Sequence, residues 1–134
     1  MIIRSKAPLR LGLAGGGTDV PPYSDLHGGA ILNATISLYA YASIEPRTDG
    51  KIAFHSIDKQ EFIEFEAESV LPINGILNLH IGVYNRIVKD YSHNPLSFTL
   101  STRVDAPAGS GLGTSSTLVV AILGAFTEWL RLPM

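Results

Sequence analysis

Alternation of apolar and polar residues with the two-residue period of a β-strand marks several parts of the chain. Residues 96–104 place apolar side chains at positions 96, 98, 100 and 104, with hydroxyl or charged side chains at the odd positions. Residues 36–44 also alternate and are rich in β-branched and aromatic side chains, which favour strands. Residues 2–6 and 9–13 form two short extended segments around Pro8. We therefore predict strands in all four stretches, and 96–104 is predicted to be half-buried.

A hairpin is predicted after the 36–44 strand. The sequence Thr48-Asp49-Gly50 supplies a turn, because glycine tolerates the positive φ that a tight hairpin requires. Residues 51–57 are the expected return strand, and residues 60–66 are expected to add a further antiparallel strand. Its acidic residues are expected to keep the outer face of that strand in solvent: Glu61, Glu64 and Glu66.

Two segments show the 3.6-residue period of helices. Residues 76–91 are predicted to form an amphipathic helix, and Pro95 prevents its continuation. The apolar positions that carry this period are Leu77, Ile81, Tyr84, Val88 and Tyr91. Residues 115–129 are almost all apolar and are expected to form a largely buried helix. The element order predicts an α+β domain, with helices on one face of a mostly antiparallel sheet.

Composition narrows the class of protein. The 134 residues are 46% hydrophobic and 16% charged, which excludes a disordered chain, and one domain is expected over residues 1–134. A net charge of -2 is too balanced for a nucleic-acid platform or a polybasic membrane anchor. No apolar stretch approaches the roughly 18 residues of a membrane span. The absence of cysteine excludes disulfide scaffolds and thiolate zinc sites. The expected location of the protein is the cytoplasm.

The segment Pro107-Ala108-Gly109-Ser110-Gly111-Leu112-Gly113-Thr114-Ser115-Ser116-Thr117 is the strongest candidate for chemistry. Its glycines allow the backbone to approach a ligand, and the first N–H groups of the following helix lack internal partners. Together with the helix dipole, these groups favour a phosphate. The hydroxyl residues that open the helix can donate to phosphate oxygens or ligate Mg²⁺.

Three better-known motifs do not fit this segment. No lysine follows Gly113 as a Walker A loop requires, and the third position of a dinucleotide-binding fingerprint falls on Thr114. Ala108 occupies the place where a nucleophile elbow around Ser110 needs glycine. The structural alternative is a strand-to-helix turn capped by Thr114 or Ser115. Three glycines and four hydroxyls exceed the demand of one cap, so phosphate binding is favoured.

A second glycine cluster lies near the start of the chain. Three consecutive glycines at 15–17 precede Thr18 and Asp19, and Arg10 lies upstream. A carboxylate accepts hydrogen bonds from vicinal sugar hydroxyls, and arginine can clamp an anion with two hydrogen bonds. Taken alone, the segment is read slightly better as a turn in which Asp19 caps a short helix started by the prolines at 21 and 22.

Other polar and aromatic residues are interpreted structurally. The histidines show no metal-ligand spacing, and His80 and His93 are expected at the surface or at an interface. The three glutamates of 60–66 are read as a solvated strand face, not as a catalytic pair. The aromatic residues expected in the core or on the sheet are Tyr39, Tyr41, Phe62, Phe65 and Phe98.

Taken jointly and in this order, the two glycine segments resemble motifs of the GHMP small-molecule kinases. Residues 107–117 resemble the phosphate-binding loop of that superfamily, with Thr114 and Thr117 as conservative departures. Residues 7–19 resemble its first, substrate-side motif. The run from Gly15 to Ser24, with 27–29 and 32–36, is most similar to the sugar kinases that act on D-glycero-D-manno-heptose 7-phosphate, and fucokinase-like enzymes share part of it.

The resemblance implies a ribosomal protein S5 domain 2-like fold and an ATP-binding domain over residues 1–134. It implies transfer of the γ-phosphoryl group of ATP to a sugar, at the anomeric hydroxyl of the heptose 7-phosphate. It assigns Mg²⁺ binding to Ser115 and contact with the transferring phosphoryl group to Arg10. It assigns sugar binding to Arg10, Gly16, Gly17, Thr18 and Asp19. The residues assigned to ATP binding are Pro107, Gly109, Ser110, Gly111, Leu112, Gly113, Thr114, Ser115 and Ser116.

Two features of the family have no counterpart in this sequence: a third glycine-rich motif, and the aspartate that serves as catalytic base in many members. We therefore expect this chain alone to be inactive or nearly so without the C-terminal domain of the family. Its last helix is then expected to be partly exposed and to favour self-association. The alternatives are another GHMP kinase, a non-catalytic phosphate-binding module, and a structural domain whose glycine loops are only turns.

Overall fold

The computed structural model describes the backbone of residues 1–14, 32–73, 75–105 and 114–133, and the side chains of these residues except 10–14, 32–37 and 114. The elements in chain order are β1 (Ile3–Ala14), β2 (Leu32–Pro46), β3 (Lys51–Ser56), β4 (Glu61–Glu66), α2 (Asn78–Ile87), the π-helical turn η1 (Val88–Ser92), β5 (Phe98–Val104) and α3 (Thr114–Leu130).

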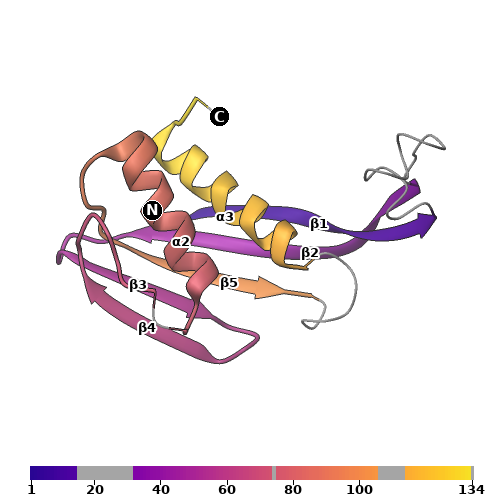
Figure 1. Cartoon of the computed structure of the whole chain (residues 1–134), viewed down its shortest axis with the longest axis horizontal. Coiled ribbons are helices and arrows are strands. Elements are labelled where there is room, and N and C mark those ends of the chain that lie inside the picture. Colours follow the sequence, from indigo (N-terminus) through magenta and orange to yellow (C-terminus); the bar gives the residue numbers. More distant parts are fainter. Residues whose placement is uncertain (15–31, 74, 106–113, 134) are drawn as a thin grey trace, which may run out of the picture.

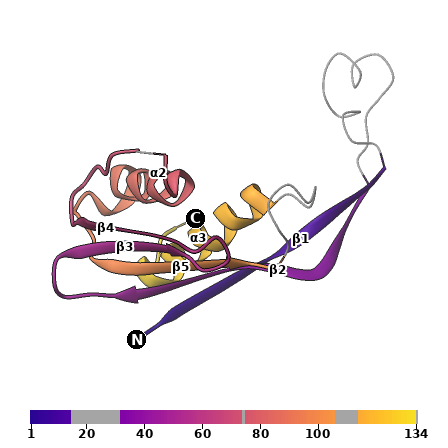
Figure 2. The same cartoon turned by 90° about the horizontal axis from the view of Figure 1, so that it is seen from below.

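The strands form one five-stranded sheet in the order β1-β2-β5-β3-β4, and α2 and α3 cover one of its faces (Figures 1 and 2). All neighbours are antiparallel except β3 and β5, which are parallel. This confirms the α+β class and the mostly antiparallel sheet with helices on one face. The predicted helices and the 60–66 and 96–104 strands are also present, with small differences at their ends.

The predicted hairpin between 36–44 and 51–57 is wrong. A turn does follow β2, and Gly50 has the expected positive φ of 73°. However, β5 lies between β2 and β3, pairing Pro46 on one side and Ile52 on the other with Phe98. The connection after β2 continues this contact, because the backbone N–H of Arg47 donates to the carbonyl of Ser97, directly before β5. An Asp-Gly turn signal reports local chain reversal, and it does not report which strand becomes the neighbour.

The prediction that Pro8 separates two short strands is wrong. β1 is continuous through Pro8, and its pairing with β2 instead shifts register between Pro8 and Arg10. Proline lacks an N–H and is tolerated in a strand at an edge or an irregularity. β1 is an edge strand of the sheet, and the irregularity follows the proline directly.

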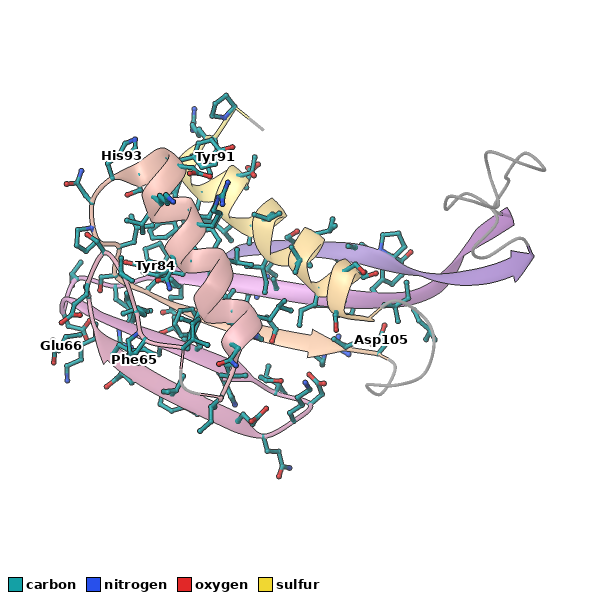
Figure 3. All side chains as sticks on the ribbon, viewed as in Figure 1. Phe65, Glu66, Tyr84, Tyr91, His93 and Asp105 are labelled. Carbon is teal, nitrogen blue, oxygen red and sulfur yellow. The ribbon has the colours of Figure 1, made fainter. Side chains whose placement is uncertain are left out.

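The core lies between the sheet and the helices, and aromatic rings fill one end of it. Phe98 on β5 is fully buried, with its ring centroid 5.8 Å from Phe54, 5.5 Å from Tyr84, 5.4 Å from Phe126 and 5.6 Å from Trp129. Tyr84 comes from α2 (Figure 3), and its fully buried ring contacts Phe54 and Phe98 of the sheet. This cluster fixes both helices on the sheet and so positions the opposite ends of the helices, where they begin.

The solvent-facing side of β4 differs from the prediction at one residue. Glu64 and Glu66 are exposed as expected, together with Phe62, which is 59% exposed. Glu61 lies on the other side of the strand, with Ile63 and Phe65, because it pairs with the buried Ser56. In the described part of the chain no helix is both long and apolar enough to cross a membrane.

Candidate functional site

The start of α3 lies where the sequence predicts a phosphate-binding helix N-terminus. The helix begins at Thr114, and the side chains of Ser115 and Ser116 in its first turn are exposed, whereas Thr117 is buried. The first N–H groups of a helix lack intrahelical acceptors and carry partial positive charge. The loop positions Pro107, Gly109, Ser110, Gly111, Leu112 and Gly113 lie outside the described residues, as does the side chain of Thr114.

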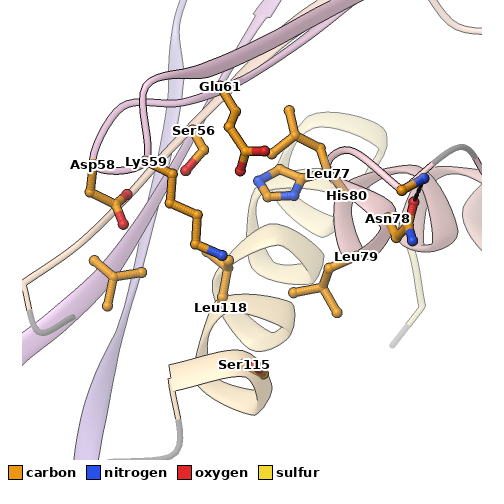
Figure 4. A pocket seen from close by; sticks show the side chains of 12 residues that line it. Ser56, Asp58, Lys59, Glu61, Leu77, Asn78, Leu79, His80, Ser115 and Leu118 are labelled. Carbon is orange, nitrogen blue, oxygen red and sulfur yellow. Dashed lines mark hydrogen bonds between the residues drawn. The ribbon is translucent and has the colours of Figure 1, made fainter. Parts of the chain in front are cut away.

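A cavity of about 260 Å³ opens beside this first turn (Figure 4). It is formed by residues from five elements or their connections, which lie far apart in the sequence. The lining residues are Ser56, Asp58, Lys59, Glu61, Gly75, Leu77, Asn78, Leu79, His80, Val104, Ser115 and Leu118. Of the residues predicted to bind ATP, Ser115 is therefore placed at this cavity.

The beginning of α2 borders the same cavity. Leu77 precedes the helix in the left-handed conformation, with φ 54° and ψ 38°, and no described side chain caps the helix N-terminus. The side chain of Asn78 is engaged outside the helix, since its Oδ1 accepts a hydrogen bond of 2.9 Å from the N–H of Gly75. The first turn contains no acidic residue. The positive ends of two helices thus border one cavity, which favours polar or anionic ligands there.

His80 is buried at the cavity, and the expectation of a surface or interface position is wrong. The residue is 4% exposed, and its Nε2 lies 2.8 Å from Oγ1 of Thr102 on β5. Its Nδ1 has no hydrogen-bond partner among the described residues. Burial lowers the pKa of His80 to about 4, with a further lowering by the charge of Lys59 and an opposing effect of Asp58. The imidazole is therefore neutral at neutral pH.

Charged groups of both signs line the cavity at the end of β3 and the start of β4. Asp58 and Lys59 lie in the turn between these strands, and Glu61 begins β4 with its side chain toward the helices (Figure 4). Among the described residues no three His, Asp or Glu side chains form a group that could hold a metal ion by themselves. A metal at Ser115 therefore requires further oxygen ligands.

Described residues from both predicted motifs meet near the start of α3. A hollow of about 230 Å³ is lined by Ala7 and Pro8 of β1 and by Ser116, Thr117 and Val120 of α3. Arg10 lies two residues beyond Pro8 on the same strand, where its backbone pairs with Thr35, and its side chain lies outside the described residues. Gly16, Gly17, Thr18 and Asp19 also lie outside them.

Sequence reasoning missed most of the cavity lining. His80 could have been found, because it lies three residues after Leu77 and four before Tyr84, which places it on the apolar face of the predicted helix. Asp58, Lys59 and Glu61 carry no such local signal. They reach the cavity only because β3 ends and β4 begins beside the two helix N-termini.

Comparison with known proteins shows which proteins this chain resembles. The family described as GHMP kinases N terminal domain matches residues 78–134. The chain is 54% identical over 132 residues to the D-glycero-alpha-D-manno-heptose 7-phosphate kinase of Campylobacter jejuni subsp. jejuni, covering 98% of this chain and 39% of that protein.

Solved structures extend the comparison. The D-glycero-D-manno-heptose 1-phosphate kinase of Bacteroides thetaiotaomicron superposes with a TM-score of 0.91 at 59% identity, covering 100% of this chain and 44% of that chain. The galactokinase of Lactococcus lactis, complexed with galactose, shares the fold at a TM-score of 0.76 and 22% identity, over 99% of this chain and 34% of that one. The chain thus spans less than half the length of each of these relatives. By its sequence and its fold, it belongs to the GHMP kinases and corresponds to their N-terminal domain.

Proposed function

We propose that the chain is the nucleotide-binding and sugar-contacting part of an ATP-dependent sugar kinase. The observation that carries the proposal is the first turn of α3, which opens on a cavity lined by Ser115 and follows directly on the glycine loop. The 54% identity to a heptose 7-phosphate kinase supports D-glycero-D-manno-heptose 7-phosphate as the sugar. The proposed acceptor of the γ-phosphoryl group is the anomeric hydroxyl, as the resemblance of the two glycine segments implies.

The triphosphate of ATP is assigned to the segment from Pro107 to Ser116. Its ligands are the backbone N–H groups of Gly109–Gly113, the first N–H groups of α3, and the hydroxyls of Thr114, Ser115 and Ser116. Backbone donors cost no reorganisation when charge develops on the transferring group, so they stabilise the transition state efficiently.

The rest of the nucleotide is assigned to the cavity beside α3. Its volume of about 260 Å³ is close to the lower end of small-molecule sites, roughly 300 Å³. Leu77, Leu79 and Leu118 provide apolar contacts, and Asn78 and Lys59 provide polar groups at the rim. The neutral imidazole of His80 adds no charge to this wall of the cavity.

Mg²⁺ is assigned to Ser115. The hydroxyl of this residue is exposed at the cavity, which the carboxylates of Asp58 and Glu61 also line, and these are the hard oxygen ligands that the ion prefers. When bound, the ion would neutralise charge on the β- and γ-phosphates.

The sugar is assigned to the segment from Arg10 to Asp19. In this assignment Asp19 accepts hydrogen bonds from the sugar hydroxyls, Gly16, Gly17 and Thr18 contact the sugar, and Arg10 stabilises the phosphoryl group in transfer. The supporting observation is the hollow between Pro8 and Ser116, because β1 runs on from this hollow toward Arg10. Acceptor and donor segments would thus meet at the start of α3.

We also propose a cytoplasmic location and a C-terminal domain of the family as the partner that completes the site. Val120 of α3 is 59% exposed, which favours association of this chain with itself where that partner is lacking.

Substitution of Ser115 by alanine tests the nucleotide assignment. Calorimetric titration of the chain with Mg-ATP should show affinity at least about tenfold weaker for Ser115→Ala, as expected for loss of an interaction with charged groups. Ser69→Ala is the matched control, because Ser69 is an exposed serine that does not line the cavity at α3, and the affinity of this variant should not change. Equal affinities of both variants would remove Ser115 from the site.

Substitution of Asp19 separates a sugar kinase from a module that only binds phosphate. Asp19→Ala should weaken binding of the heptose 7-phosphate and leave Mg-ATP affinity unchanged. A phosphate-binding module predicts no effect of this substitution on either ligand.

A further inference from the structure

The sheet face turned away from α2 and α3, here called the open face, carries a continuous row of side chains across all five strands. The pairing registers place Arg4, Ser43, Ser101, His55 and Phe62 in this row, from β1 to β4. In Figure 2 both helices lie on the other side of the sheet. The face has no covering element among the described residues.

A hollow of about 270 Å³ lies on the open face, on the β1 side of its centre. Ser43 and Ser101 are paired neighbours on β2 and β5. Adjacent strands are about 4.8 Å apart, so two short side chains side by side leave a depression between longer neighbours. Those neighbours are Arg4, Tyr41 and Arg103.

Two serine hydroxyls and one guanidinium at the hollow have unused hydrogen-bonding capacity. The hydroxyls of Ser43 and Ser101 and the guanidinium of Arg4 make no hydrogen bond or ion pair with any described residue. An arginine has five N–H donors in a fixed planar fork, and each serine hydroxyl can donate one more. The hollow therefore offers donors from three sides and an uncompensated positive charge.

Arg103 is held in place before any ligand arrives. Its Nη1 donates to Asp105 at 2.8 Å, and its guanidinium lies 4.2 Å from the ring centroid of Tyr41. Tyr41 is in turn paired with Lys6, whose ammonium lies 4.6 Å from the ring centroid of Tyr39. A donor held by packing loses less conformational entropy on binding.

The charges of the open face are separated along it. Arg4 and Arg103 line the hollow, Lys6 lies two residues beyond Arg4 on β1, and Asp105 pairs with Arg103. The exposed Glu45 lies two residues beyond Ser43 on the same face of β2, outside the hollow's lining. At the opposite edge Glu64 is engaged by Arg47 and Lys51. A ligand at the hollow thus meets net positive charge, and its negative charge is not opposed by a free carboxylate in the hollow's lining.

We propose that this hollow is a binding site for a phosphate group, free or on a small phosphomonoester, held by the guanidinium groups of Arg4 and Arg103 and the hydroxyls of Ser43 and Ser101. Planar guanidinium forks match the oxygens of phosphate, and hydroxyls complete its coordination. The site lies on the opposite side of the sheet from the cavity at α3, and the proposal does not depend on the nucleotide assignment.

The test is a titration of the 134-residue chain with inorganic phosphate and, separately, with glycerol 3-phosphate, at constant ionic strength and followed by the backbone amide resonances. Saturable shifts at Ser43 and Ser101 are expected. Affinity should fall about tenfold in Arg4→Gln, the loss expected for a charge-assisted hydrogen bond, and less in Ser101→Ala. Lys51→Gln is the matched control, because it removes one positive charge from the far end of the same face.

Each outcome decides the proposal. The proposal is supported if either ligand saturates the shifts with an affinity that is weaker in Arg4→Gln and unchanged in Lys51→Gln. The ligand that binds more tightly then shows whether free phosphate or a monoester is preferred. The proposal is overturned if the shifts rise linearly with ligand concentration or are confined to the first turn of α3. It is also overturned if the affinity falls equally in Arg4→Gln and Lys51→Gln. Shifts at the α3 turn alone would leave the nucleotide assignment intact, so the two proposals fail separately.

Discussion

β5 passes through two very different surroundings. At its first residue, Phe98 is enclosed by the rings of Phe54, Tyr84, Phe126 and Trp129, all with centroids within 6 Å. Four residues later, on the same side of the strand, Thr102 meets a buried histidine beside a cavity of about 260 Å³. The helices are packed against the sheet where they end and stand over a cavity where they begin.

The two ends of the helices therefore have different roles: the packed end stabilises the fold, and the open end provides the proposed binding site. Close packing of large apolar side chains supplies most of the stability of a small domain. A binding site needs unfilled space and polar groups, and both reduce stability. Anchoring the helix ends at the aromatic cluster allows the helix starts to remain open without loss of the fold. The predictions below test this division, from the largest expected effect to the smallest.

Removing the ring at the packed end should have the largest effect. Phe98→Ala is expected to lower the free energy of unfolding by about 3–5 kcal/mol, because the fully buried ring leaves a cavity that its neighbours cannot fill. Urea denaturation measures this change. Phe62→Ala is the matched control, since Phe62 is 59% exposed, and it should change stability by less than about 1 kcal/mol. Similar losses in both variants would contradict the assignment of stability to the aromatic cluster.

At the open end, acid should destabilise the fold through His80. Its pKa in the folded chain is about 4, below the ordinary value of 6.5, so the unfolded chain binds a proton more readily. Stability is then complete above pH 6.5 and is lost as pH falls from 6.5 toward 4. The difference between these two pKa values corresponds to a loss of roughly 3 kcal/mol in the free energy of unfolding at the acidic end of this range.

Urea denaturation as a function of pH checks this expectation. The loss between pH 6.5 and 5 should disappear in His80→Asn and persist in His93→Asn, because His93 is exposed and asparagine tolerates its positive φ of 59°. An unchanged pH profile of His80→Asn would show that another group is responsible.

A single hydroxyl should have a smaller effect. Thr102→Val keeps the shape of the side chain but leaves the Nε2 of His80 without its partner at 2.8 Å, which is expected to cost about 1–3 kcal/mol. Thr99→Val on the same strand is the control, because Thr99 lies on the open face and accepts only a 3.4 Å hydrogen bond from Arg47. Urea denaturation of the two variants should rank Thr102→Val as the less stable; the reverse order would contradict a structural role for the His80–Thr102 pair.

The sequence predicted the packed end of the molecule better than the open end. The alternation around Phe98 and the helical period through Tyr84 follow from short-range geometry, so both elements were correctly predicted. The strand that pairs with β2 was not correctly predicted. The choice of β5 over β3 depends on pairing between residues about 50 positions apart, such as Pro46 and Phe98. The cavity is assembled in the same long-range way, which is why Glu61 was read as part of a solvated strand face although it lines the cavity.

The smallest expected effects concern the charges of the cavity and have opposite signs. The charge of Lys59 lowers the pKa of His80 and that of Asp58 raises it, each less than burial does. Lys59→Gln should therefore raise the pKa of His80, and Asp58→Asn should lower it further, as followed by the imidazole proton resonances during a pH titration. Neither residue belongs to the aromatic cluster, so urea stability at neutral pH should hardly change in either variant. Shifts of the same sign in both variants would mean that the substitutions alter the solvation of His80 and not its electrostatic surroundings. Opposite shifts would show that the open end responds to single charges, as a site for a charged ligand must, whereas the packed end responds only to lost volume.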